Sequence, residues 1–259
     1  MSSKAWAIAV FLIIGIVKLP VEQRAHQQME ATGTLKAPVA PTLRENLGQA
    51  AFAASLGGLR SLVASVVYLQ AYTAFERGRF DQVESLHALT TQLQPRYPVY
   101  WDDAATRMAY DAASHYLYDE KRPRLYRNQL YKQHFQRGLE FAEQGVKHLP
   151  DSKLLHQRLG EFYSRLMSTP EQKVLVSADS LKAGQHYMLA YKNGALPFTE
   201  RFAAYEYAKL KDAPAQWREA YDILRRHDVM TRRQGVVLPT TVGLIKELGQ
   251  RLGLPTSSP

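Results

Sequence analysis

Apolar residues recur at the three- and four-residue spacing of amphipathic helices along most of the chain, from about residue 43 to residue 253. Proline and glycine fall mainly at the joints between these stretches, where they end one helix and begin the next. No run of alternating β-branched residues is long enough to predict a sheet. The pattern therefore predicts an all-α domain over residues 43–253, followed by a frayed tail at residues 254–259.

Residues 1–19 form a different kind of segment. An uncharged apolar run at residues 5–17 follows a short charged start, and Lys18 interrupts it. If Lys18 extends its side chain to the interface, the span reaches about 17 residues, near the lower limit for crossing a bilayer. No small-residue cleavage site follows, so we predict an uncleaved signal-anchor, a transmembrane helix through residues 5–19. The alternatives are a cleaved signal peptide and a short hydrophobic helix docked on the domain.

Residues 20–42 carry three prolines, few large apolar side chains and mixed charges, which is the composition of a flexible linker. Lys4 precedes the predicted span, whereas Lys18 and Arg24 follow it, so the positive-inside bias is weak. The short tail ahead of the span resembles that of bacterial anchors whose body lies outside the cytoplasm. We therefore expect a single-pass membrane protein with its body on the periplasmic side.

A second apolar stretch, residues 50–75, could be mistaken for another membrane span. Arg60 and the pair Gly57-Gly58 lie inside it. An arginine at the centre of a bilayer costs about 2.5 to 3.5 kcal/mol on the insertion scale. The stretch is therefore interpreted as a buried, alanine-rich core helix.

Turn residues and aromatic residues recur along the domain at repeated spacings. A predicted helix ends at Gly78, a second ends at Pro95, and Trp101 opens a third. After a further stop at Pro150 comes the sequence Leu159-Gly160-Glu161-Phe162-Tyr163. Together these residues resemble the tetratricopeptide repeat family over about residues 58–227.

That resemblance implies antiparallel helix pairs stacked into a right-handed solenoid, with small residues at the crossing points and aromatic residues between the pairs. A polar and aromatic insertion after Ser114 interrupts the second unit, and the fourth unit matches poorly, so the repeat number stays open. The last predicted helix, residues 240–252, has one apolar and one charged face, which suits a C-terminal cap. An irregular helical bundle is the alternative fold.

In tetratricopeptide domains the first helices of successive pairs line a groove that commonly holds a peptide or a helix. Carried over by position, the groove residues come from three predicted units and mix tyrosines with charged side chains. They are Tyr68, Tyr72 and Glu76, then Asp102, Thr106 and Tyr110, then Gln157, Glu161 and Arg165. The alternative is that several of these tyrosines pack against the next helix pair.

The chain is basic, with a net charge of +9 and an isoelectric point near 9.6. One basic patch, interleaved with tyrosines, consists of Lys121, Arg122, Arg124, Arg127, Lys132 and Arg137. The first interpretation is a solvated helix face, with Tyr126, Leu130 and Phe135 in the core. The second is a site for an acidic protein or anionic lipid, and single-stranded nucleic acid ranks last because a periplasmic body would not meet it.

Motifs that carry chemistry are missing from the sequence. There is no phosphate-binding loop, no nucleophile elbow, no zinc-protease motif and no cysteine. The eight histidines include no pair at helical i, i+4 spacing. Asp102 and Asp103 are expected in the first turn of the Trp101 helix, where the helix dipole stabilises them. We therefore predict no enzyme, no metal and no cofactor.

These features predict a membrane-anchored scaffold that binds protein partners in a bacterial envelope-associated assembly. The first alternative is a structural subunit of a larger membrane complex, or a basic repeat protein that binds an acidic partner or nucleic acid. The second is an enzyme with an unrecognised site in the helical groove. That second alternative requires a deep pocket that joins Asp102, His115 and arginine side chains.

Overall fold

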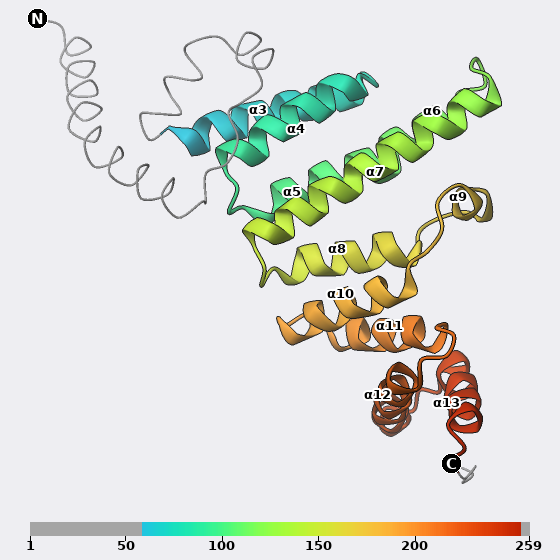
Figure 1. Ribbon diagram of the computed structural model, residues 1–259. Coiled ribbons are helices and arrows are strands. Elements are labelled where there is room, and N and C mark those ends of the chain that lie inside the picture. The colour runs from blue at the N-terminus through green and yellow to red at the C-terminus, as the bar shows by residue number, and fades with distance from the viewer. Residues whose placement is uncertain (1–58, 255–259) are drawn as a thin grey trace, which may run out of the picture. The chain divides into compact units, whose positions relative to one another are not determined.

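The computed structural model describes residues 59–254, and within that range it is helical and contains no strand (Figure 1). This confirms the predicted all-α class. The predicted anchor at residues 1–19, the linker at residues 20–42, residues 43–58 of the predicted domain and nearly all of the tail lie outside the described residues. Within the described range, every helix is too short or too polar to cross a membrane.

The helices form two compact units, one ending at Met108 and the other beginning at Ala109. The first unit contains the helices α3 (Arg60–Glu76), α4 (Phe80–Leu93) and α5 (Pro98–Thr106). A π-helical segment, η1 (Arg107–Ala112), spans the boundary between the units. In the first unit, α3 packs against α4 and α4 packs against α5.

The second unit holds the remaining helices, which follow one another along the chain (Figure 1). They are α6 (Ala113–Leu117), α7 (Arg124–His148), α8 (Lys153–Ser164), α9 (Pro170–Leu175), α10 (Ser180–Lys192), α11 (Pro197–Ala208), α12 (Pro214–Arg233) and α13 (Pro239–Arg251). Neighbours pack in order: α6 with α7, α7 with α8, α8 with α10, α10 with α11, α11 with α12, and α12 with α13. The last helix agrees with the predicted one at residues 240–252 to within a residue at each end.

Local signals in the sequence set the helix ends. Gly78 has a φ of +67°, which favours glycine, and it reverses the chain between α3 and α4. Pro95 and Pro150 follow α4 and α7, as the sequence predicted. Several helices also begin with proline at the first helical position, where its missing N–H costs nothing: α5, α9, α11, α12 and α13.

Two tryptophans fasten helix starts to the turns that precede them. The Trp101 indole N–H donates to the carbonyl of Pro95 at 2.8 Å, and that of Trp217 donates to the carbonyl of Leu210 at 2.9 Å. Each tryptophan lies three residues after the first proline of its helix, α5 or α12. Each indole therefore packs as an apolar group and also holds the preceding turn through its hydrogen bond.

Small residues allow close helix contacts in the second unit. A Cβ atom added to Gly160 in α8 would lie 2.6 Å from Cδ1 of Tyr187 in α10. A Cβ atom added to Gly184 in α10 would lie 2.3 Å from Cε1 of Tyr207 in α11. Carbon atoms normally approach to about 3.5–4.0 Å, so only glycine fits at both crossings.

The polar stretch after Ser114 does not interrupt a helix pair, contrary to the sequence interpretation. α6 continues to Leu117, the chain turns, and α7 then runs for 25 residues from Arg124. The stretch therefore extends the pair at its tip (Figure 1). A real interruption occurs later, where α9 and its flanking loops separate α8 from α10.

Candidate protein-binding surface

One face of α3 exposes a continuous stripe of large apolar side chains. Its members recur at intervals of three or four residues, and Leu62 and Leu69 have 60% and 63% of their surface exposed. The α3 stripe consists of Leu59, Leu62, Val66, Leu69 and Tyr72. Exposed apolar patches on folded proteins are often interaction sites, so the α3 stripe is a candidate binding surface.

The opposite face of the same helix is buried. Ala64, Val67, Ala71 and Ala74 are almost fully covered, and α3 packs on α4. A helix that is apolar all round is normally buried all round. The prediction of a buried core helix is therefore right for one face of α3 and wrong for the other.

The predicted groove residues of α3 fall in different environments. Tyr72 belongs to the α3 stripe, and Glu76 is exposed in the last turn. Tyr68 is half-buried and contacts the rings of His87 and Tyr100, with centroids 5.9 and 5.1 Å away. Burial, and then the nearby carboxylate of Asp103, raise the pKa of Tyr68 to about 12. The Tyr68 ring is therefore packed against other aromatic rings, and its hydroxyl lies near Asp103.

A small polar cluster lies beneath Tyr68. Asp103 is 3.8 Å from Nε2 of His87 and 3.5 Å from Nε of Arg107, whose guanidinium lies 4.1 Å from the centroid of the Phe75 ring. Burial lowers the pKa of His87 to about 4, although Asp103 acts in the opposite direction. His87 is therefore neutral at pH 7, and its Nδ1 has no hydrogen-bond partner in the described structure.

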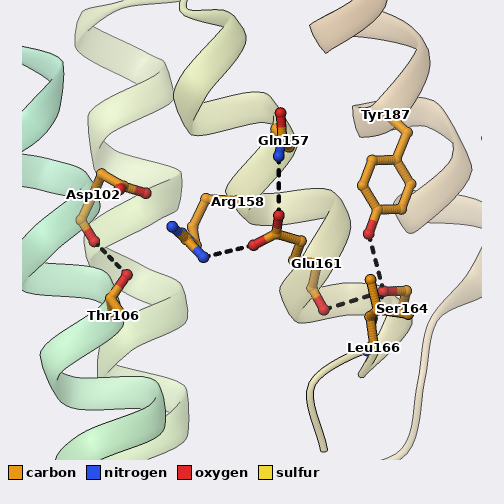
Figure 2. Close-up of polar contacts among 8 residues, drawn as sticks. All are labelled: Asp102, Thr106, Gln157, Arg158, Glu161, Ser164, Leu166 and Tyr187. Atoms are coloured by element: carbon orange, nitrogen blue, oxygen red, sulfur yellow. Dashed lines mark hydrogen bonds and ion pairs between the residues drawn. The ribbon is translucent and has the colours of Figure 1, made fainter. Parts of the chain in front are cut away.

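Asp102 and Asp103 do not lie in the first turn of their helix. α5 begins at Pro98, so its first turn contains no acidic residue. The predicted dipole stabilisation is therefore wrong, and Asp103 pairs with Arg107 instead. Asp102 and Thr106 are half-buried, and the Thr106 hydroxyl donates to the Asp102 carbonyl at 2.8 Å (Figure 2).

The predicted groove residues on α8 form a satisfied polar group. Gln157 Nε2 donates to Glu161 at 3.1 Å, and Arg158 donates to the other carboxylate oxygen at 2.5 Å (Figure 2). Tyr110 on η1 is half-buried, with its ring 5.2 Å from that of Phe162, and burial raises the pKa of Tyr110. These residues hold their own elements together before any partner is present.

Arg165 is not available to a partner, contrary to the prediction. It follows the last turn of α8 with a left-handed φ of +56°, and only 1% of its surface is exposed. Its guanidinium lies 3.7 Å from the centroid of the Phe135 ring and donates to the hydroxyl of Tyr131. Among the residues that the structure describes, its Nε and Nη1 atoms find no hydrogen-bond partner. A cation–π contact thus replaces a carboxylate partner.

The predicted basic patch divides into exposed and engaged residues. Lys121, Arg124 and Lys132 are exposed. Arg122 pairs with Asp119 at 2.8 Å, Arg127 donates to the Leu117 carbonyl at 3.1 Å, and Arg137 pairs with Glu140 at 3.0 Å. Of the aromatic residues assigned to the core beneath this patch, Phe135 is buried, whereas Tyr126 is exposed.

Sequence reasoning missed two polar contacts of the second unit that are buried at least in part. His156 and His186 lie 30 positions apart, yet their Nδ1 atoms are 2.9 Å apart. Glu200 accepts from Arg226 at 2.7 Å and lies 2.9 Å from Nε2 of His227. Both pairings join different helices, so no local spacing could have indicated them.

The described part of the chain holds no group of three or more histidine or carboxylate residues arranged to bind a metal ion. A surface hollow at His115 is lined also by Ser114, Tyr118, Asp119 and Lys121, and it lies within the second unit. The chain matches no family model, and no curated protein or solved structure is significantly similar to it. The tetratricopeptide resemblance therefore stays a prediction.

Proposed function

We propose that this protein is a membrane-anchored helical scaffold of the tetratricopeptide type that binds a protein partner through the α3 stripe. The observation that carries the proposal is the bare row of large apolar side chains on a helix whose other face is already packed. No charge accompanies the row, since residues 61–75 contain no charged side chain and the exposed polar residues beside it are serine, glutamine and threonine. Its only favourable interaction is the burial of apolar surface against a complementary protein.

An amphipathic helix is the partner that best fits the stripe. Leu59, Leu62, Val66 and Leu69 follow the three-four-three spacing of a seam between two helices. Each is already partly covered, so its complete burial contributes about 1 kcal/mol. Four such residues give about 4 kcal/mol before the costs of association, which indicates a moderate affinity that further contacts must reinforce.

The repeat part of the proposal is supported by the order of packing. Helices adjacent in the chain pack against one another, and the glycine crossings at Gly160 and Gly184 have the close contact expected between repeated pairs. The motif around Leu159 supplies the first of these glycines. The membrane part is supported by the uncharged apolar run at residues 5–17.

Site-specific photocrosslinking tests the partner. A benzophenone side chain at Val66 or Leu69, in the full chain in its native membranes, should yield a crosslink to a second protein. The same group at Gln82, exposed on α4, should not yield that product. A crosslink only to residues of the same chain, or none, would overturn the proposal.

A matched pair of variants tests the chemistry of the contact. Leu62→Asp places a charge in the stripe and should abolish the crosslink from Leu69, because burial of an unpaired carboxylate is prohibitive. Ser61→Asp places the same charge one position away, on an exposed residue outside the stripe, and should leave the crosslink intact. Membrane attachment is tested separately: deletion of residues 1–19 should move the chain from the carbonate-washed membrane pellet to the supernatant.

A further inference from the structure

The tip of the α6–α7 pair and the segment around α9 lie next to each other in the second unit. The Gln172 side chain in α9 donates to the hydroxyl of Ser114 in α6 at 3.3 Å, and Figure 1 shows where the two helices lie. Both segments expose large apolar side chains. The most exposed of these are Leu125 and Val174, with 83% and 86% of their surface exposed. The distal surface consists of Tyr118, Leu125, Tyr126, Leu166, Met167 and Val174.

Specific contacts hold this turn in place. Arg127 donates to the Leu117 carbonyl at 3.1 Å, which joins the first turn of α7 to the end of α6. Arg122 pairs with Asp119 at 2.8 Å and lies over the ring of Tyr126. These contacts order the turn, and its apolar side chains remain exposed to solvent.

α9 is fastened in a similar way. Thr169 and Gln172 form a reciprocal capping box at its start, where Pro170 occupies the first helical position. Gln172 is buried, whereas Val174, two residues on, is the most exposed large apolar residue of the described chain. The exposure of Val174 therefore follows from the way α9 is anchored.

Exposed basic residues outnumber exposed acidic ones beside these apolar residues. Lys121 and Arg124 are exposed on the tip together with Glu120, and Lys132 is exposed on α7. On α9, Lys173 and Glu171 are both exposed, so the basic excess comes from the tip and α7. Residues 124–139 of α7 contain four basic side chains and no acidic one. Surfaces that lie at the interface of an anionic bilayer typically combine protruding aliphatic and tyrosine side chains with lysine and arginine.

We propose that the distal surface docks on the headgroups of an anionic lipid bilayer, with Leu125 and Val174 inserted below them. A protein partner fits this surface less well, because its apolar residues are divided between two segments, with charged side chains among them, and form no continuous stripe. A fluid bilayer accepts separate protrusions without matching their shape. The proposal rests on the membrane association proposed above, and it adds a second contact that sets how the second unit meets the membrane.

A fluorescent probe at single positions tests the docking directly. The chain has no cysteine, so Leu125→Cys and Val174→Cys can each carry one nitrobenzoxadiazole label. The control is Asp151→Cys, an exposed position beyond the far end of α7, which is about 37 Å long. Full-length chain is reconstituted with vesicles of phosphatidylcholine alone or of phosphatidylcholine mixed with phosphatidylglycerol.

With the mixed vesicles, the labels at positions 125 and 174 should shift their emission to shorter wavelength and become accessible to lipid-borne quenchers. The label at position 151 should do neither. Lys121→Gln with Arg124→Gln should lower the ratio of docked to undocked probe roughly thirty-fold, since each basic residue contributes about 1 kcal/mol at such a surface. The control pair Lys147→Gln with Lys192→Gln removes the same net charge elsewhere and should leave the ratio unchanged.

The outcomes separate this inference from the proposed anchor. Flotation of the chain with both kinds of vesicle reports the anchor, whereas the probe environment reports the docking. Equal emission shifts with and without phosphatidylglycerol, or no shift at positions 125 and 174, would overturn the inference even if the chain floats. If the chain floats only with anionic vesicles, and does so with shifted probes, the docking holds and the anchor fails.

Discussion

Gly184→Ala is the sharpest test of the helix packing in the second unit. The added methyl carbon would lie 2.3 Å from Cε1 and 2.5 Å from Cδ1 of Tyr207. The Tyr207 ring is itself buried and belongs to a core cluster of buried apolar residues. That cluster contains Ala204, Ala208, Ala220, Ile223, Leu224 and Leu248. Because these neighbours surround the ring, it cannot turn aside without disturbing α11 and α12.

Two opposing effects set the magnitude. Alanine is favoured over glycine inside a helix by about 1 kcal/mol. The overlap with Tyr207 is more than 1 Å short of a normal carbon contact, and overpacking of this kind costs about 3 kcal/mol. The net destabilisation is therefore about 2 kcal/mol. For a folded part of this size that corresponds to a fall in melting temperature of about 4–8 °C.

The assay is thermal unfolding of the full chain in mild detergent, followed by far-ultraviolet circular dichroism. Gly243→Ala is the matched control, because Gly243 is an exposed position in α13 where an added Cβ meets no atom within 4 Å. That control should gain up to about 1 kcal/mol. In the double variant Gly184→Ala with Tyr207→Ala, most of the overlap cost should disappear. A Gly184→Ala variant that melts at or above the wild-type temperature would refute the close α10–α11 contact.

Two further predictions concern buried polar groups. His87 has a pKa of about 4 in the folded chain against about 6.5 when unfolded, so the unfolded chain binds more protons between these values. The protonation of His87 in the unfolded chain should therefore lower the free energy of unfolding by about 2 kcal/mol between pH 7 and pH 5. Urea titrations at the two pH values measure this change. The His87→Phe variant should lack it. Arg165→Met should change the urea midpoint little, because the lost Tyr131 bond and ring contact are offset by removal of the two donor nitrogens that lack a partner in the described structure. Arg165→Ala should lose about 2–4 kcal/mol through the cavity it leaves, and equal midpoints for the two Arg165 variants would contradict this account.

Helix ends were predictable where a local signal fixes the backbone. Gly78, Pro95 and Pro150 each act on their immediate neighbours, and the helices end beside them. The tip of the α6–α7 pair was not predictable in this way, because its polar and tyrosine-rich sequence lacks a clear apolar period. A stretch without regularly spaced apolar residues was interpreted as an insertion, although its backbone belongs to the ends of two helices.

The environment of individual side chains was much harder to predict than the helices that carry them. Arg165 was assigned to the groove by its position in the predicted repeat, and its partners Tyr131 and Phe135 are some thirty positions earlier in the chain. His156 and His186 are equally distant in sequence. Such contacts depend on which faces of two helices meet, and a single sequence reports that only through the apolar pattern.

The same physical quantity, exposed apolar surface, points to different partners at the two proposed surfaces. On α3 the apolar residues are continuous and stand on an uncharged stretch, so they can interdigitate with a second helix along several turns. On the distal surface Leu125 and Val174 stand on separate segments with charged side chains around them, so a rigid protein would have to match each protrusion separately. A bilayer has no such requirement, because its chains rearrange around each inserted group while its headgroups meet the charges. The arrangement of polar neighbours, more than the apolar area, therefore distinguishes a protein-binding face from a membrane-binding one.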